Sequence, residues 1–225
     1  MARLYLFAEG VTEETFADTL LKPHLAAHGV YLHHPVRIAH ARKRGRIHRG
    51  GGRNYEPMKN DIRRLLSQEK DGDVFFTTMI DLYALPARFP RRDEAEGLRH
   101  DPRQRVGFLE QAFGEDINDR RFLPYIQLHE YEALLFSDPS GFRYFYGHHE
   151  AQLAALQAIA ASHSSPELID DGPHSAPSKR IEAQFPDYAK PLMGPEIAAW
   201  IGLEAMRSKC PHFHAWVSRL EGLAP

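Results

Sequence analysis

Acidic side chains stand at the ends of apolar segments in this 225-residue sequence. Glu9 and Asp81 each end a run of apolar residues. Glu130 and Glu132 follow a third run. In a parallel sheet the carboxyl ends of the strands lie along one edge, so these acids, remote in the chain, are expected to meet there. Clustered carboxylates raise one another's pKa unless a cation neutralises them, and Mg²⁺ and Mn²⁺ prefer carboxylate oxygens. The sequence therefore predicts a divalent metal site.

Some of these acids also have simpler interpretations. Glu13 lies near the start of a predicted helix, where its charge would complement the helix dipole. Glu132 would be a solvated helix residue. Glu9 and Asp81 are the stronger candidates because each ends a buried strand. The predicted metal ligands are Glu9, Glu13, Asp81, Glu130 and Glu132, and the predicted catalytic residues are Glu9, Asp81 and Glu130.

A second feature is a basic segment between residues 37 and 53, which contains no acid and includes three consecutive glycines. Its composition predicts a flexible loop over residues 42–53 that follows a phosphate backbone with salt-dependent affinity. The alternatives are a solvated charge run and a loop that docks on an acidic partner protein. The residues that we assign to nucleic-acid binding here are Arg42, Lys43, Arg44, Arg46 and Arg49.

A third feature is a short basic motif at residues 176–181. Ser178 is predicted to cap a helix whose first turn contains Lys179 and Arg180. Cations in a first turn oppose the helix dipole, and an anionic substrate would explain their placement. The equally plain alternative is that both are exposed, solubilising residues.

The predicted elements alternate between strand and helix over the first 136 residues. The predicted strands are residues 2–8, 30–39, 73–81 and 122–128, and the predicted helices are residues 12–28 with an interruption at Pro23, 56–70, 103–113, 150–162 and 195–220. Residues 82–102 are predicted to form an irregular excursion over the site. The alternation predicts an α/β fold with a mainly parallel sheet of about four strands in residues 1–136, and a helical extension in residues 137–225 that packs on this core.

Composition narrows the class of protein. With 43% hydrophobic and 26% charged residues the chain is expected to be globular, and a net charge of −2 indicates no partner by itself. The single cysteine, Cys210, excludes an internal disulfide framework. We expect a cytoplasmic protein because no secretion signal or membrane-spanning pattern is visible. No Gly-Lys-Ser/Thr phosphate loop is present, so the chain is not expected to hydrolyse ATP by itself.

Four motifs together resemble a known family. They lie at residues 9–13, 80–86, 124–136 and 176–181, with the sequences EGVTE, IDLYALP, PYIQLHEYEALLF and APSKRI. Their order resembles the Toprim superfamily, which includes type II topoisomerases, small primases and the overcoming-lysogenisation-defect nucleases. Within it, the chain is similar to the domain of unknown function 4276 family. The resemblance implies a Toprim-like core.

The resemblance also implies a metal-dependent phosphodiester chemistry. A glutamate at the end of the first Toprim strand acts as general acid or base, and Glu9 matches it. An Asp-x-Asp pair at a later strand end holds Mg²⁺; Asp81 matches its first member, but Tyr83 stands where the second acid belongs. Glu130 or Glu132 is the available substitute. Gly10 and His129 lie inside the family motifs and are assigned to substrate binding with Lys179 and Arg180.

The leading hypothesis is a Mg²⁺- or Mn²⁺-dependent nuclease acting on DNA or RNA. Family resemblance suggests a partner ATPase of the ABC or structural-maintenance type, in a phage or plasmid defence setting. The first alternative is a non-catalytic Toprim-like module that binds nucleic acid or nucleotide and regulates an ATPase, which Tyr83 favours. The second is a small-molecule phosphohydrolase that uses the same acids. The carboxyl-terminal helices either cover the core or form a homodimer.

Overall fold

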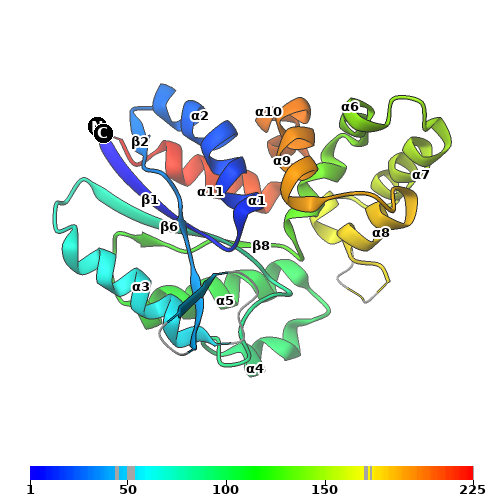
Figure 1. Ribbon diagram of the computed structural model, residues 1–225. Coiled ribbons are helices and arrows are strands. Elements are labelled where there is room, and N and C mark those ends of the chain that lie inside the picture. Colours follow the sequence, from blue (N-terminus) through cyan, green and yellow to red (C-terminus); the bar gives the residue numbers. More distant parts are fainter. Residues whose placement is uncertain (44–45, 50–53, 170–171, 173, 225) are drawn as a thin grey trace.

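The computed structural model describes residues 1–43, 46–49, 54–169, 172 and 174–224, and between residues 39 and 49 it describes the backbone alone. Its centre is a parallel sheet with helices on both faces (Figure 1). This arrangement confirms the predicted α/β fold with a mainly parallel sheet and a helical carboxyl-terminal part.

The sheet has the strand order β2-β1-β6-β7. These strands are Val30–Leu32, Ala2–Ala8, Val74–Asp81 and Phe122–Leu123. Two short strands, β3 (Val36–Arg37) and β8 (Ile126–Gln127), pair with β1 and β6. Every pair in this sheet is parallel, so Ala8 and Asp81 both lie at its carboxyl edge.

The sheet has six short strands rather than four because two predicted strands are interrupted. The segment 30–39 breaks between β2 and β3 at Pro35, and the segment 122–128 breaks between β7 and β8 at Pro124. Proline has no N–H for the hydrogen-bond ladder and is therefore poorly accommodated inside a sheet. The two central strands match the prediction, since neither contains proline.

The first helical segment is interrupted as predicted. It consists of α1 (Val11–Phe16), a π-helical stretch η1 (Ala17–Leu21) and α2 (Lys22–Ala27). Pro23 lacks the N–H that would bond to the carbonyl of residue 19, and the widened π turn lies directly before it. The helix begins at Val11 with Gly10 as its N-cap, one residue before the predicted start at residue 12.

Two helical layers cover the sheet. On one face, α3 (Tyr55–Gln68) and α5 (Pro102–Ile117) pack against alternate side chains of β1 and β6. On the other face, α1, α2 and α11 (Pro211–Glu221) pack against the remaining ones (Figure 1). Because both faces are covered, β1 and β6 appear in the sequence as nearly continuous apolar runs.

The basic segment is not simply a loop. Its described part forms an antiparallel hairpin of β4 (Ala39–Lys43) and β5 (Arg46–Arg49). The loop prediction is therefore wrong for these residues. Composition concealed the pairing because charged side chains favour strands weakly, whereas backbone hydrogen bonds define the hairpin. Residues 44–45 and 50–53, which include Arg44, lie outside the described residues.

The excursion after β6 is mostly irregular, as predicted. It contains only α4 (Arg92–Ala95) and the 3₁₀ turn η2 (Glu96–Leu98). Its apolar side chains, among them Leu85 and Phe89, are buried in the same core cluster as α3 and α5. These side chains therefore pack beside the layer of α3 and α5. Of the residues in the excursion, Tyr83 alone lines the cavity at the acidic edge, which is described below.

The carboxyl-terminal part is a series of short helices. They are η3 (Tyr131–Ser137), η4 (Pro139–Phe142), α6 (Arg143–Tyr146), α7 (Glu150–Ala161), η5 (Pro166–Leu168), α8 (Pro177–Gln184), α9 (Lys190–Ile201), α10 (Leu203–Lys209) and α11. The predicted helix over residues 195–220 is wrong as one element. Gly202 adopts a φ of 81°, and Pro211 begins a new helix. Within the described chain, no helix is both long and apolar enough to cross a bilayer.

The last helix returns to the sheet. Trp216 stacks on Tyr125 with ring centroids 4.1 Å apart, and its indole N–H donates to Thr77 Oγ1 at 2.9 Å. Phe213 and Leu220 join the core cluster that contains Leu4 and Leu6 of β1. Residues on both sides of position 136 thus share one core cluster, and the domain division at that position stays a prediction.

Candidate active site

Two acids from neighbouring strands lie side by side at the carboxyl edge of the sheet. Ala8 and Met79 are paired in the β1–β6 ladder, and Glu9 follows this pair by one residue and Asp81 by two. The N–H of Asp81 donates to Glu9 Oε2 at 2.8 Å. Parallel pairing of two buried strands therefore brings together acids 72 positions apart in the chain.

A backbone turn brings the third acidic segment to the same edge. The N–H of Tyr131 donates to Asp81 Oδ1 at 2.9 Å, and the N–H of Tyr83 donates to the carbonyl of His129 at 3.2 Å. His129 is buried and has a φ of 60°, a left-handed conformation that costs a non-glycine residue about 1 kcal/mol or more. The chain turns sharply at this strained residue, which aims Glu130 and Glu132 at the cluster.

Glu130 joins the edge to helix α8. Its carboxylate accepts a short hydrogen bond from the backbone N–H of Ser178. Ser178 lies inside the helix, after the N-cap Ala176 and Pro177, so the prediction that its side chain caps the helix is wrong. Proline occupies the first helical position instead, and Glu130 satisfies one of the N–H groups left open at the helix start.

The two cations of α8 have local partners. Lys179 Nζ lies 2.6 Å from Glu182 Oε2, and Arg180 Nε donates to the carbonyl of Ser175 at 2.7 Å. Lys179 is exposed and lines a cavity beside the acids, which leaves its charge accessible from solvent.

One residue of the cluster escaped the sequence analysis. Lys190, the first residue of α9, places Nζ 2.8 Å from Glu132 Oε2 and 3.4 Å from Asp81 Oδ2. One sequence feature could have identified Lys190: it is a cation at the start of a helix, the same unfavourable placement that drew attention to Lys179. The partners of Lys190 lie far away in the chain, so no local spacing marked it.

Burial and mutual repulsion change the protonation of the acids. Burial, and next the charge of Glu13, raises the pKa of Glu9 to about 7. Burial also raises the pKa of Glu132 to about 7, against the opposing charge of Lys190. The pKa of Asp81 lies well above its ordinary range because the carboxyl group is fully buried, although Lys190 opposes this shift.

Lys190 stays charged in this environment. Burial lowers the pKa of its ammonium group, but the carboxylates of Asp81 and Glu132 raise it more, so the net shift is upward. A single lysine thus faces several acids. Glu132 Oε1 is buried and has no hydrogen-bond partner within the described structure. A buried carboxylate oxygen without a donor is costly, which marks this group as a candidate cation ligand.

A cavity of about 310 Å³ opens beside the edge and is lined by two of its acids, Glu130 and Glu132. Tyr83 stands 52% exposed at this cavity, in the place where the family resemblance calls for a second aspartate. Burial raises the pKa of its phenol, which keeps the group neutral. The lining residues include Tyr83, Glu130, Glu132, Ser178, Lys179 and Lys190.

The remaining predicted residues lie around this cluster. Glu13 is buried, and its Oε2 accepts the N–H of Gly10 at 2.9 Å. Gly10 has an extended φ of −146°, so its backbone does not require glycine; a Cβ there would lie 3.2 Å from Glu13 Oε2. The basic hairpin leaves the sheet at this edge, since Ile38 N–H donates to the carbonyl of Ala8 at 3.0 Å. Arg42, Lys43, Arg46 and Arg49 belong to that hairpin.

The acids lie near one another, but their carboxylate oxygens do not converge on one position where an ion could be coordinated. Among the described residues, no three of these carboxylates place ligand oxygens within 4.8 Å of one another. Lys190 instead bridges Asp81 and Glu132. The donor set fits a hard divalent ion, because it consists of carboxylate oxygens with a surplus of negative charge. Closing it around an ion requires side-chain movement and withdrawal of the lysine.

The fold and the edge define the class of protein: an α/β protein with a parallel sheet, a carboxylate-rich site at its carboxyl edge and a helical carboxyl-terminal part. Residues 8–221 match the family described as Domain of unknown function (DUF4276), and the chain belongs to this family, which confirms the resemblance found in its motifs.

Solved structures of two OLD proteins resemble the chain. The chain is similar to the C-terminal region of the Burkholderia pseudomallei OLD protein, with 16% identity, a TM-score of 0.43 and 100% of both chains covered. It is also similar to the C-terminal region of the Xanthomonas campestris pv. campestris OLD protein, with 16% identity, a TM-score of 0.37, and 97% of this chain and 98% of that chain covered. No curated protein matches the chain.

Proposed function

We propose that the protein is a Toprim-type, metal-dependent nuclease that hydrolyses phosphodiester bonds of DNA or RNA. The hydrogen bond of 2.8 Å from Asp81 N–H to Glu9 Oε2 carries this proposal, because it holds two strand-end acids together. The bond from Tyr131 N–H to Asp81 Oδ1 then joins the segment of Glu130 and Glu132 to the same place.

The residues that would hold the ion are Glu9, Glu13, Asp81, Glu130 and Glu132. They offer only carboxylate oxygens, which Mg²⁺ and Mn²⁺ prefer over nitrogen or sulfur. When bound, such an ion supplies Lewis-acid polarisation of the scissile phosphate and lowers the pKa of a coordinated water. The unpartnered Oε1 of Glu132 supports the assignment, because cation binding would compensate its burial.

Glu9 is suited to move a proton. Its pKa of about 7 lies near neutral pH, where a carboxyl group can both accept and return a proton during a reaction cycle. Asp81 N–H fixes the orientation of this carboxyl group through Oε2. Lys190 positions Asp81 and Glu132 and can stabilise negative charge that develops on a phosphate.

Basic residues beside the edge would hold the nucleic acid. Lys179 is exposed at the cavity, and the hairpin that contains Arg42 and Arg46 starts next to Glu9. Neutralising backbone phosphates with such cations gives affinity without base specificity. This supports a polymeric substrate over a small phosphodiester.

The test is nicking of supercoiled plasmid in the presence of Mn²⁺. Glu9→Gln and Asp81→Asn should each abolish nicking, because each replaces a charged oxygen donor by a neutral amide of the same size. Asp93→Asn, which changes an exposed acid of α4, is the matched control. Circular dichroism should show the same fold in all variants. Full nicking activity in both edge variants would contradict the proposal.

Tyr83 favours a second candidate, a non-catalytic module that binds nucleic acid and regulates an ATPase partner. A tyrosine replaces one expected acid, and Lys190 already neutralises Asp81 and Glu132. Calorimetric titration with Mn²⁺ separates the two candidates. Binding that Asp81→Asn removes supports the nuclease, whereas no binding at millimolar Mn²⁺ supports the regulatory module.

The family resemblance extends the proposal to a partner. We propose an ABC-type or structural-maintenance-type ATPase as that partner, with a role in phage or plasmid defence. Co-expression with an ATPase of this type, followed by affinity purification, tests the association. The nicking assay should then be repeated with the complex and ATP.

A further inference from the structure

A second group of metal-binding side chains lies away from the acidic edge. It combines His24 of α2, His28 at the end of that helix, and Glu221 at the end of α11. One donor atom from each lies within 4.8 Å of the other two, and within the described residues this is the one His, Cys, Asp or Glu group with that property. His24 Nε2 is 2.6 Å and His28 Nε2 is 3.8 Å from the same atom, Glu221 Oε1.

The fold brings these donors together before any ion arrives. His24 and His28 are four residues apart on a helix, so their side chains lie on one face, with ring centroids 4.7 Å apart. Glu221 reaches them because Trp216, Val217 and Leu220 fasten α11 to the core. Packing therefore preorganises the carboxylate of Glu221, so that an ion would not have to use its binding free energy to position this group.

The tautomer of His28 suits a metal ligand. Its Nδ1 lies 3.0 Å from the carbonyl of His24, an acceptor, so Nδ1 carries the proton. The neutral ring then presents an unprotonated Nε2 towards Glu221. A ring whose other nitrogen donates to a backbone carbonyl is the usual arrangement of metal-bound histidines.

Glu221 Oε1 is the acceptor that His24 and Arg207 share. His24 Nε2 lies 2.6 Å from this oxygen, and Arg207 Nη1 donates to it at 2.5 Å and lies 3.3 Å from His24 Nε2. In the absence of an ion, His24 therefore carries its proton on Nε2 and donates it to Oε1. A metal ion bound to Nε2 and Oε1 would take the place of that proton and would displace Arg207 Nη1 from Oε1.

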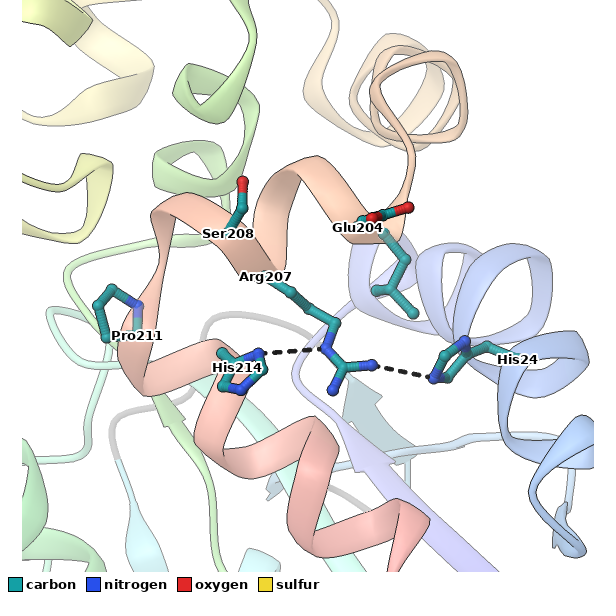
Figure 2. Close-up of a pocket in the computed structure, with 7 residues that line it drawn as sticks. His24, Glu204, Arg207, Ser208, Pro211 and His214 are labelled. Carbon is teal, nitrogen blue, oxygen red and sulfur yellow. Dashed lines mark hydrogen bonds between the residues drawn. The ribbon is translucent and has the colours of Figure 1, made fainter.

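Arg207 has other partners that would remain after such a change. Its Nη2 donates to Glu221 Oε2 at 3.0 Å and to Ser218 Oγ at 3.1 Å, and its Nε lies 3.4 Å from His214 Nδ1. Beside it is a cavity of about 690 Å³, lined by His24, Leu203, Glu204, Arg207, Ser208, Pro211 and His214. Figure 2 shows Arg207 between His24 and His214 in this cavity.

We propose that His24, His28 and Glu221 form a second cation site, which binds Zn²⁺ or a similar transition-metal ion through two imidazole nitrogens and one carboxylate oxygen. Imidazole ligands select such ions over Mg²⁺. Three protein ligands leave one position of a tetrahedral ion open, next to a cavity that admits a small ligand or water. The positive charge of Arg207 opposes the ion and limits its affinity.

Calorimetric titration of the purified protein with Zn²⁺ tests the site. The wild type should bind one equivalent that His28→Ala loses, whereas His100→Ala, a change of an exposed histidine elsewhere, should keep it. Arg207→Gln should bind Zn²⁺ more tightly because an opposing charge is gone. Asp81→Asn should bind as the wild type does, which separates this site from the acidic edge.

In the titration, the proposal would be overturned by no Zn²⁺ binding by the wild type at micromolar concentrations, by unchanged binding by His28→Ala, or by loss of binding by Asp81→Asn. His28 is exposed, so its replacement should not unfold the protein. The visible spectrum of bound Co²⁺ gives an independent measurement, because its intensity reports a tetrahedral site with nitrogen ligands. An octahedral Co²⁺ spectrum in the wild type and in His28→Ala alike would also overturn it.

Discussion

Two regions of the molecule hold negative charge beside a basic side chain, and they differ in their donor atoms. The acidic edge consists of Glu9, Glu13, Asp81, Glu130 and Glu132. The histidine pocket consists of His24, His28 and Glu221. Each sets carboxylates against a basic residue from the carboxyl-terminal helices, Lys190 at the edge and Arg207 at the pocket. The edge offers only oxygen donors, whereas the pocket adds two imidazole nitrogens. The comparison indicates that donor type decides which ion each region can select.

The two regions also differ in what holds their side chains. At the edge, backbone N–H groups of Gly10, Asp81, Tyr131 and Ser178 each donate to one of the acids. In the pocket, Glu221 is held by side chains, chiefly Arg207 and His24. Backbone donors move little, so we expect the edge to keep its geometry when single side chains change, and the pocket to adapt.

The largest expected effect separates the regions by activity. Asp81→Asn should lower the rate of Mn²⁺-dependent plasmid nicking by about a thousandfold, as loss of a group that stabilises transition-state charge does. His28→Ala should leave the rate unchanged. Rates from a plasmid nicking time course check both values. An equal loss in the two variants would remove the functional distinction between edge and pocket.

The next effect concerns the two basic residues. Lys190→Met should lower the free energy of unfolding by about 3 kcal/mol, because it leaves buried carboxylates without a counterion. Urea denaturation at neutral pH measures this change. Mn²⁺ should restore more stability to Lys190→Met than to the wild type, since an ion can replace the lost charge. Lys179→Met, a change of an exposed lysine, is the control.

Arg207→Gln should have a smaller effect, about 1 kcal/mol, because its pocket is closer to solvent and His24 can still donate to Glu221. A loss of stability as large as that of Lys190→Met would show that the two counterions are equivalent.

The pH dependence of stability should distinguish the edge. Glu9 has a pKa of about 7 in the folded protein against an ordinary value of 4.5. Between these values the folded state binds more protons than the unfolded state, so stability falls as pH rises from 4.5 through 7. Glu9→Gln should remove a decline on the order of 2 kcal/mol, allowing for partial exposure of this residue.

Urea denaturation across this pH range, without divalent ions, tests the sign. Glu196→Gln, a change of an exposed acid of α9, should reproduce the wild-type curve. A wild-type stability that rises with pH, and does so equally in Glu9→Gln, would show that Glu9 is not destabilised by burial.

The smallest expected effect is on nucleic-acid binding. Lys179→Gln should lower the salt dependence of DNA or RNA affinity by about 0.9 in the log–log slope, the value for one phosphate contact. Fluorescence anisotropy at several salt concentrations measures the slope. Lys209→Gln, on the exposed surface of α10, should not change it. Identical slopes for wild type and Lys179→Gln would show that Lys179 does not contact a phosphate of the nucleic acid.

Much of the central fold could be predicted because burial on both faces leaves a local signature. The runs that became β1 and β6 are nearly continuous in apolar residues, and the interruption near Pro23 follows from the missing N–H. The break at Gly202 and the hairpin of β4 and β5 were missed. A glycine is compatible with several conformations, and strand pairing in a charged segment depends on backbone bonds that composition does not record.

The sequence by itself determined where the acids stand on their strands and which family motifs they belong to. Glu9 and Asp81 could be identified because a charged residue at the end of a buried strand contrasts with its neighbours. Tertiary structure alone decided what faces them. Lys190 meets Asp81 across 109 positions, and His24 meets Glu221 across 197. Such contacts are set by the packing of whole helices on the sheet, and no local spacing of residues specifies that packing.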